Sequence, residues 1–143
     1  MVKRKLRRWR DRGAAAVEFA LVVPVLIFLI FGSIEFGLYV QARTLIENAA
    51  REGVRTASLV GSSDGSAAEG EVKNAAINAL GSVSGTVDPP KVTCTTPAST
   101  CVFGSAKAGS VATVSITVHY TGITGLFPML PNLMTASSTM RIE

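Results

Sequence analysis

Histidine and cysteine are scarce in this sequence, and their scarcity argues against most kinds of catalysis. There is one histidine, His119, and there are two cysteines, Cys94 and Cys101. Two thiols and a distant imidazole are too few ligands for a zinc site. No glycine-rich loop follows a predicted strand, and no pair of carboxylates or nucleophile–base pair stands at a recognisable spacing. We therefore expect no enzyme activity, no cofactor and no bound metal.

Aromatic residues are also few, at 6% of the chain, and the excess of positive charge is confined to residues 1–13. That segment carries seven basic residues and one acid, a net charge of +6, whereas the remainder carries seven basic and nine acidic residues, a net charge of −2. Single-stranded nucleic acid is bound on aromatic platforms among positive charges, and only Trp9 stands there. We therefore expect no nucleic-acid partner and interpret the basic segment as a signal of membrane topology.

An apolar run, residues 14–36, follows the basic segment. It holds about 20 apolar residues, and as a helix it matches the roughly 30 Å hydrocarbon core of a bilayer. The basic flank should stay in the cytoplasm, which places residues 37–143 outside. A secretory signal fits less well, because its apolar core is only about 7–15 residues long. Gly32-Ser33-Ile34-Glu35 is also a poor exit from such a core.

Near its cytoplasmic end the run contains an acid, Glu18. A carboxylate at the centre of a membrane helix costs about 2.5–3.5 kcal/mol, and less near the end. If the chain is cut after Gly13, the new amine of Ala14 stands four residues before Glu18, on the same helix face. That amine, or the amine of a neighbouring subunit, would then pair with the carboxylate. The alternative is an uncut anchor in which Glu18 reaches the headgroups, and both interpretations stay open here.

The helix should continue beyond the membrane, from about Ala14 to about Leu59. Within residues 37–60 the apolar side chains recur on one face, at a period of 3.6 residues: Leu38, Ala42, Leu45, Ile46, Ala49, Gly53 and Ala57. Charged side chains follow the opposite face, with Glu47 placed to pair with Arg51. The small residues of the stripe allow close backbone approach, and we expect them to pack the protein's own head rather than neighbouring helices. Pro24 removes one backbone hydrogen bond in mid-span, which predicts a kink or local melting there.

Residues 61–143 predict a small α+β head. A Gly/Ser linker over residues 61–65 leads into a helix that ends near Leu80, followed by a loop from Ser82 to Pro90. Alternation then predicts three or four short antiparallel strands with one face on the long helix: Lys91–Thr95, Thr100–Phe103, Ser110–Tyr120 and residues 136–143. Cys94 and Cys101 are even in number, close in sequence and on the oxidising side, so we expect a disulfide. The apolar stretch from Ile123 to Met134 is interpreted as a lid on the sheet edge, with a contact patch as the alternative.

The segment from Arg12 to Ala57 resembles the TadE-like family, the pseudopilins of the tight-adherence (Flp) pilus system. The resemblance rests on Arg-Gly-Ala-Ala-Ala-Val-Glu-Phe-Ala-Leu at residues 12–21, on Pro24, on Glu35-Phe36-Gly37 and on Asn48-Ala49-Ala50-Arg51-Glu52-Gly53-Val54-Arg55-Thr56-Ala57. It implies cleavage between Gly13 and Ala14 by a prepilin peptidase. It also implies that Glu18, which precedes Phe19 in the motif, serves processing or assembly.

The resemblance completes the predicted organisation, a type IV pilin-like lollipop. A cleaved leader (1–13) precedes a transmembrane helix (14–36), its extracytoplasmic continuation (37–60) and the head (61–143). The expected function is that of a minor pilin-like subunit needed to assemble a surface pilus, held in the cytoplasmic membrane by a single span. The implied partners are the prepilin peptidase, other pilin-like subunits, the inner-membrane assembly platform and the lipid bilayer. The alternative is an uncleaved single-pass anchor that presents a scaffold domain of an envelope complex.

Overall fold

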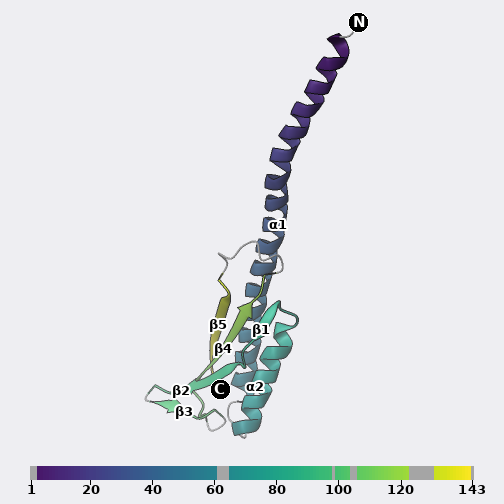
Figure 1. Ribbon diagram of the computed structural model, residues 1–143. Coiled ribbons are helices and arrows are strands. Elements are labelled where there is room, and N and C mark those ends of the chain that lie inside the picture. Colours follow the sequence, from purple (N-terminus) through teal and green to yellow (C-terminus); the bar gives the residue numbers. More distant parts are fainter. Residues whose placement is uncertain (1–2, 61–64, 98, 104–105, 123–130, 143) are drawn as a thin grey trace.

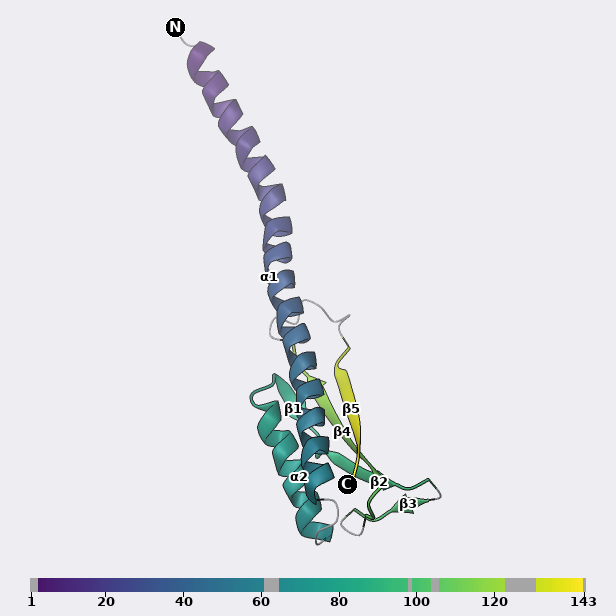
Figure 2. The ribbon, with the colours of Figure 1, turned by 180° about the vertical axis from the view of Figure 1, so that it is seen from behind.

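The computed structural model describes residues 3–60, 65–97, 99–103, 106–122 and 131–142, with side chains from Gly13 in the first helix and from Ala67 in the second. Figures 1 and 2 show one long helix that projects from a small head made of a second helix and a sheet. The elements follow the order α1 (Lys3–Val60), α2 (Gly65–Leu80), β1 (Gly85–Val87), β2 (Lys91–Thr95), β3 (Thr100–Cys101), β4 (Val111–Tyr120) and β5 (Leu133–Arg141). The predicted α+β lollipop is confirmed.

Helix α1 is 58 residues long and passes through Pro24 without interruption. Such a length is stable only where something covers the apolar surface, since propensity alone does not sustain it. Figure 1 shows a gentle curve in the part of α1 that projects from the head, and no sharp break. Softening of the helix at Pro24 as it leaves a bilayer stays a prediction. The helix starts before Ala14, earlier than predicted, and ends at Val60, one residue past the expected end.

Strand β4 is the centre of an antiparallel sheet. Along one side it pairs with β5 over nine residue pairs, from Val111↔Arg141 to His119↔Leu133. Along the other side it pairs first with β2 and then with β1, and β3 continues the sheet beyond β2. The expectation that residues 82–90 form only a loop was wrong, because β1 adds a fifth strand. A three-residue strand carries too little alternation to be visible in the sequence.

The hydrophobic core lies between the sheet and the two helices. The inward face of β4 is buried as alternation predicts, with Val114, Ile116 and Val118 fully enclosed. Helix α1 supplies Ala42, Ile46, Ala49, Ala50, Val54 and Ala57, and α2 supplies Ala68, Val72, Ala76 and Leu80. The small-residue stripe of α1 therefore packs its own head, as expected.

Some details of α1 and the head differ from the predictions, among them the end of β3, which is Cys101 and not Phe103. Glu47 pairs with Arg43, at 3.4 Å between carboxylate and guanidinium, and not with Arg51. Strand β5 starts at Leu133, three residues earlier than expected. Of the apolar stretch Ile123–Met134, residues 123–130 lie outside the described part, so its interpretation as a lid is not tested; Met134 is buried and the three residues before it are exposed.

Gly53 and Gly70 form a matched pair for testing how closely α1 packs. A Cβ on Gly53 would stand 3.0 Å from both Ala76 Cβ and Val114 Cγ1, whereas a Cβ on Gly70 would meet nothing within 4 Å. We expect Gly53→Leu to lower the free energy of unfolding of the head by about 2 kcal/mol or more through overpacking. Gly70→Leu should raise it by about 0.5–1 kcal/mol through helix propensity. Denaturant unfolding in detergent measures both, and equal effects would contradict the packing described.

Candidate functional site

The predicted processing residues lie together near the free end of α1. Gly13, Ala14, Glu18 and Phe19 follow one another on exposed helix, with 70% of Phe19 accessible. Within the described part of the chain, the Glu18 carboxylate has neither a hydrogen bond nor an ion pair. Positions 14 and 18 are one turn apart on the same face. The structure thus leaves Glu18 open to a partner from outside the fold.

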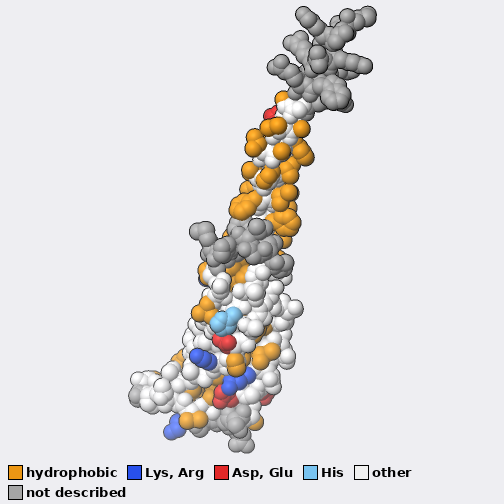
Figure 3. Space-filling model, viewed as in Figure 1, with side chains coloured by type: hydrophobic (Ala, Val, Ile, Leu, Met, Phe, Trp, Pro, Cys, Tyr) orange, Lys and Arg blue, Asp and Glu red, His pale blue; other side chains and the backbone are white. Residues whose placement is uncertain are grey.

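A continuous apolar band follows Glu18 along α1. Its large side chains face outward on all sides of the helix, as the exposure of Leu21, Val22, Leu26 and Ile27 shows. Figure 3 shows hydrophobic side chains over the visible face of the projecting part of the molecule. Among the described residues, this helix is long and apolar enough to cross a membrane, and its most apolar 18-residue window has a mean hydropathy of 2.7 with none of it buried. These are the properties of a single-pass membrane helix.

The apolar band ends at a buried acid that sequence reasoning missed. Glu35 is only 2% exposed, and its carboxylate lies against Gly122 at the end of the sheet. The signal was present in the sequence, because Glu35 belongs to the Glu35-Phe36-Gly37 motif, but no role was predicted for it. This carboxylate therefore marks the level at which the head begins to enclose α1.

Tyr120 sits beside Glu35 where β4 reaches α1. Its ring packs edge-to-face on Tyr39, with centroids 5.7 Å apart and planes at 89°. Its hydroxyl is buried and has no hydrogen-bond partner within the described residues. Burial, and secondarily the negative charge of Glu35, raises the pKa of Tyr120 above its usual value near 10.

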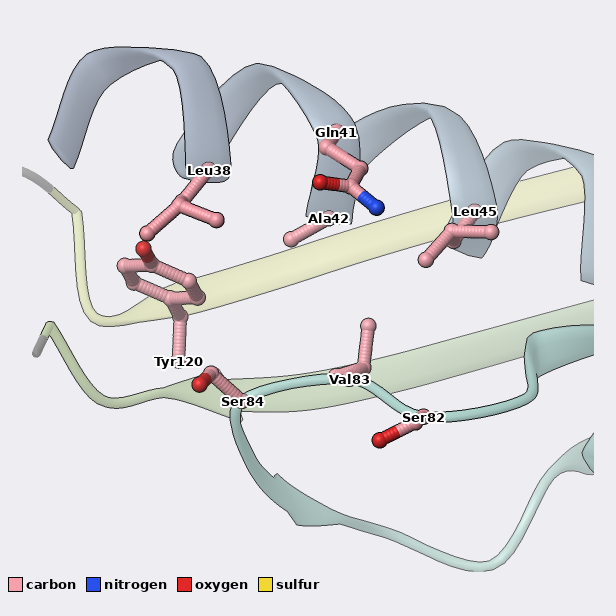
Figure 4. A pocket seen from close by; sticks show the side chains of 8 residues that line it. All are labelled: Leu38, Gln41, Ala42, Leu45, Ser82, Val83, Ser84 and Tyr120. Atoms are coloured by element: carbon pink, nitrogen blue, oxygen red, sulfur yellow. The ribbon is translucent and has the colours of Figure 1, made fainter. Parts of the chain in front are cut away.

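A shallow cavity of about 180 Å³ adjoins this tyrosine. Figure 4 shows Leu38, Ala42 and Leu45 on α1 facing Val83 and Ser84 of the segment that follows α2, with the Tyr120 ring closing one end toward Leu38. Four polar residues line it as well, Gln41, Ser82, Ser84 and Tyr120 itself. The lining contains no histidine, cysteine or acid.

The remaining candidates lie in the head, apart from the processing residues. Cys94 and Cys101 are joined by a disulfide across the β2–β3 pair, with Cα atoms 5.0 Å apart. His119 contacts Asp88 at 3.2 Å on the surface, and both side chains are about half exposed. No group of three potential metal ligands occurs in the part of the chain for which side chains are described.

Replacing Tyr120 tests the buried hydroxyl through the pH dependence of folding. Because the pKa of Tyr120 is raised in the folded state, its contribution to stability is complete below about pH 10 and is lost as pH rises through the folded-state value. We expect Tyr120→Phe to be neutral or slightly stabilising at pH 7, since the hydroxyl has no partner to lose. Above pH 10 the free energy of unfolding of the variant should rise relative to that of the parent by up to about 1.4 kcal/mol per pH unit.

Denaturant unfolding between pH 7 and 11 measures this difference. Tyr39→Phe, which removes the hydroxyl of the other ring in the pair, is the control and should keep the alkaline loss. Parallel pH profiles for Tyr120→Phe and the parent would show that ionisation of this hydroxyl does not oppose folding.

Comparison with known proteins identifies one segment. The family model described as TadE-like protein matches residues 13–55, which covers the apolar band and most of the part of α1 that packs the head. Searches of curated proteins and of solved structures each found no match. The predicted resemblance is confirmed: residues 13–55 of this chain match the TadE-like family.

Proposed function

We propose that this protein is a minor pilin-like subunit that is needed to assemble a tight-adherence surface pilus, and that a prepilin peptidase matures it by cutting between Gly13 and Ala14. The single observation that carries the proposal is the unpartnered Glu18 at the end of an outward-facing apolar helix, within a segment that matches the TadE-like family. In the membrane, such a carboxylate requires a partner. Cleavage supplies one, because it creates an ammonium group one helical turn away.

The pairing also defines how subunits would be arranged. Within one subunit, the new amine of Ala14 and the carboxylate of Glu18 partly neutralise each other. Between subunits that are staggered along their axes, the amine of one meets the carboxylate of the next, so the charge pair sets the axial step. The apolar band supports this arrangement, because it is exposed over its whole circumference and gains from contact with several neighbouring helices.

The proposal places the protein in the cytoplasmic membrane, with its N-terminus in the cytoplasm and its head outside. The basic segment before Gly13 supports this orientation, and the disulfide in the head supports an oxidising compartment. The partners are then the prepilin peptidase, other pilin-like subunits and the assembly platform in the inner membrane. The subunit performs no chemistry of its own.

The N-terminal residue of the mature protein tests the cleavage directly. We expect intact-mass measurement and N-terminal sequencing of protein purified from its own membranes to give a chain that starts at Ala14. Gly13→Leu should leave the leader in place, because a bulky side chain replaces the small residue at the cut. A native chain that starts at Met1 would overturn the proposal in favour of an uncut anchor for a scaffold domain.

The role of Glu18 is tested by removing its charge at constant size. Glu18→Gln should reduce surface pili, counted by electron microscopy, by about tenfold or more, since the amine of Ala14 loses its partner in the apolar environment. Glu71→Gln, on the exposed face of α2, is the control and should leave pili unchanged. Normal piliation with Glu18→Gln, in cells where that variant is the sole copy, would contradict the assigned role.

A further inference from the structure

Strand β5 is an edge strand, and no strand pairs with its outer side among the residues that the structure describes. Figures 1 and 2 both show it at the margin of the sheet, alongside α1, and β4 is its pairing partner within the described residues. The register continues past the strand ends in hydrogen bonds from Tyr120 N–H to the Asn132 carbonyl and from Ile142 N–H to the Ser110 carbonyl. The backbone N–H and C=O groups of the even-numbered residues of β5 therefore form the hydrogen bonds to β4. In an antiparallel ladder the backbone groups of the odd-numbered residues then point to the open edge.

This edge lacks the usual devices against strand addition. Natural proteins protect an edge with proline, lysine, a bulge or a very short strand. Strand β5 has nine residues, contains neither proline nor lysine, and pairs with β4 in unbroken register. Its one charged residue is Arg141, at the very end. A long, regular edge of this kind is a template for an added strand.

A groove runs between this edge and α1. It consists of two adjacent cavities of about 190 and 240 Å³. We call it the β5 groove, and its lining used here is Tyr39, Arg43, Glu47 and Arg51 on α1 and residues 133–138 on β5. The helix advances about 18 Å from Tyr39 to Arg51, and the strand advances about 17 Å over residues 133–138. The lining residues on α1 and those on β5 therefore extend over the same length. The β5 groove thus has the length of a short extended peptide.

The charges in the β5 groove favour an acidic occupant. Arg43 and Glu47 neutralise each other in an exposed ion pair. Arg51, on the next turn, lines the same groove beside Ser137 and Ser138 and makes no ion pair with any residue the structure describes. An unpaired guanidinium next to open backbone donors and acceptors can bind a carboxylate while the backbone pairs as a strand.

A second copy of the chain fits this edge poorly. Two β5 strands joined antiparallel about a two-fold axis through the sheet would reverse one α1 relative to the other, which two copies inserted alike in one membrane cannot do. Two β5 strands joined in parallel would bring no carboxylate to Arg51, because β5 contains no acidic residue. The groove therefore selects a different partner.

We propose that the β5 groove binds an extended, acidic segment of another protein, which adds to the sheet as a strand beside β5 and places a carboxylate on Arg51. The inference goes beyond the proposed function and requires only the head and a common insertion in the membrane. A failure of cleavage at Gly13 would leave it standing.

Site-specific photo-cross-linking in the host cell tests the proposal. A benzoylphenylalanine at Thr135, which lines both cavities, should form an adduct with another protein, and mass spectrometry should place the bond within about three residues of an Asp or Glu. The same group at Asn78, on the exposed face of α2, is the control and should not form this adduct. Arg51→Glu should lower the adduct yield about tenfold, whereas Arg55→Glu, one turn further on, should not.

A proline separates strand addition from simple proximity. Because Ser137 is odd-numbered, Ser137→Pro removes an N–H from the open edge and none from the ladder with β4. Ser137→Pro should therefore abolish the adduct. The control, Ser137→Ala, should keep the adduct, and the heads of the two variants should unfold at similar temperatures. Any of three results would overturn the proposal. The adduct could form with a second copy of this chain, its yield could be unchanged by Arg51→Glu, or the yield at Thr135 could be no higher than at the Asn78 control.

Discussion

The structure depends on the close contact between the sheet and the C-terminal part of α1, residues 37–60. Gly53 lets the helix backbone approach Ala76 and Val114 so closely that a methyl group in its place would press on both. The alanines above and below it on the same face are fully buried. This contact holds the head on a helix that otherwise has no cover. Because the helix is continuous, it also fixes the head relative to the membrane segment.

One helix thus serves two environments, and the boundary is visible in the pattern of its residues. Up to Phe36 the apolar side chains face every direction, which suits lipid or neighbouring helices. From Leu38 onward they form a single stripe, and the opposite face carries charged residues. The change of pattern is what allowed the sequence to predict the long helix, the membrane segment and the side on which the head packs. The alternation in residues 110–120 predicted β4 and its buried face for the same reason.

What the sequence could not predict depends on contacts between distant segments. Strand β1 pairs with the end of β4 that β2 does not reach. Gly85 can take part in this pairing because it has no side chain, whereas a Cβ at this position would collide with the His119 carbonyl. Burial of Glu35 depends on the approach of Gly122, 87 residues later in the chain. The choice of Arg43 rather than Arg51 as the partner of Glu47 is a matter of rotamers among exposed pairs that differ little in energy. Local pattern carries no information about any of these.

Glu18 and Glu35 lie at the two ends of the apolar band of α1, and their surroundings in the structure differ. They bound the apolar band at a separation of 17 residues, about 25 Å along a helix, which approaches the thickness of a hydrocarbon core. The head encloses Glu35 at the end of the band nearer to it, beside Gly122 and Tyr120. At the opposite end of the band no part of the described fold encloses Glu18. The same chemical group is therefore buried within the described fold at one end of the apolar band and exposed at the other.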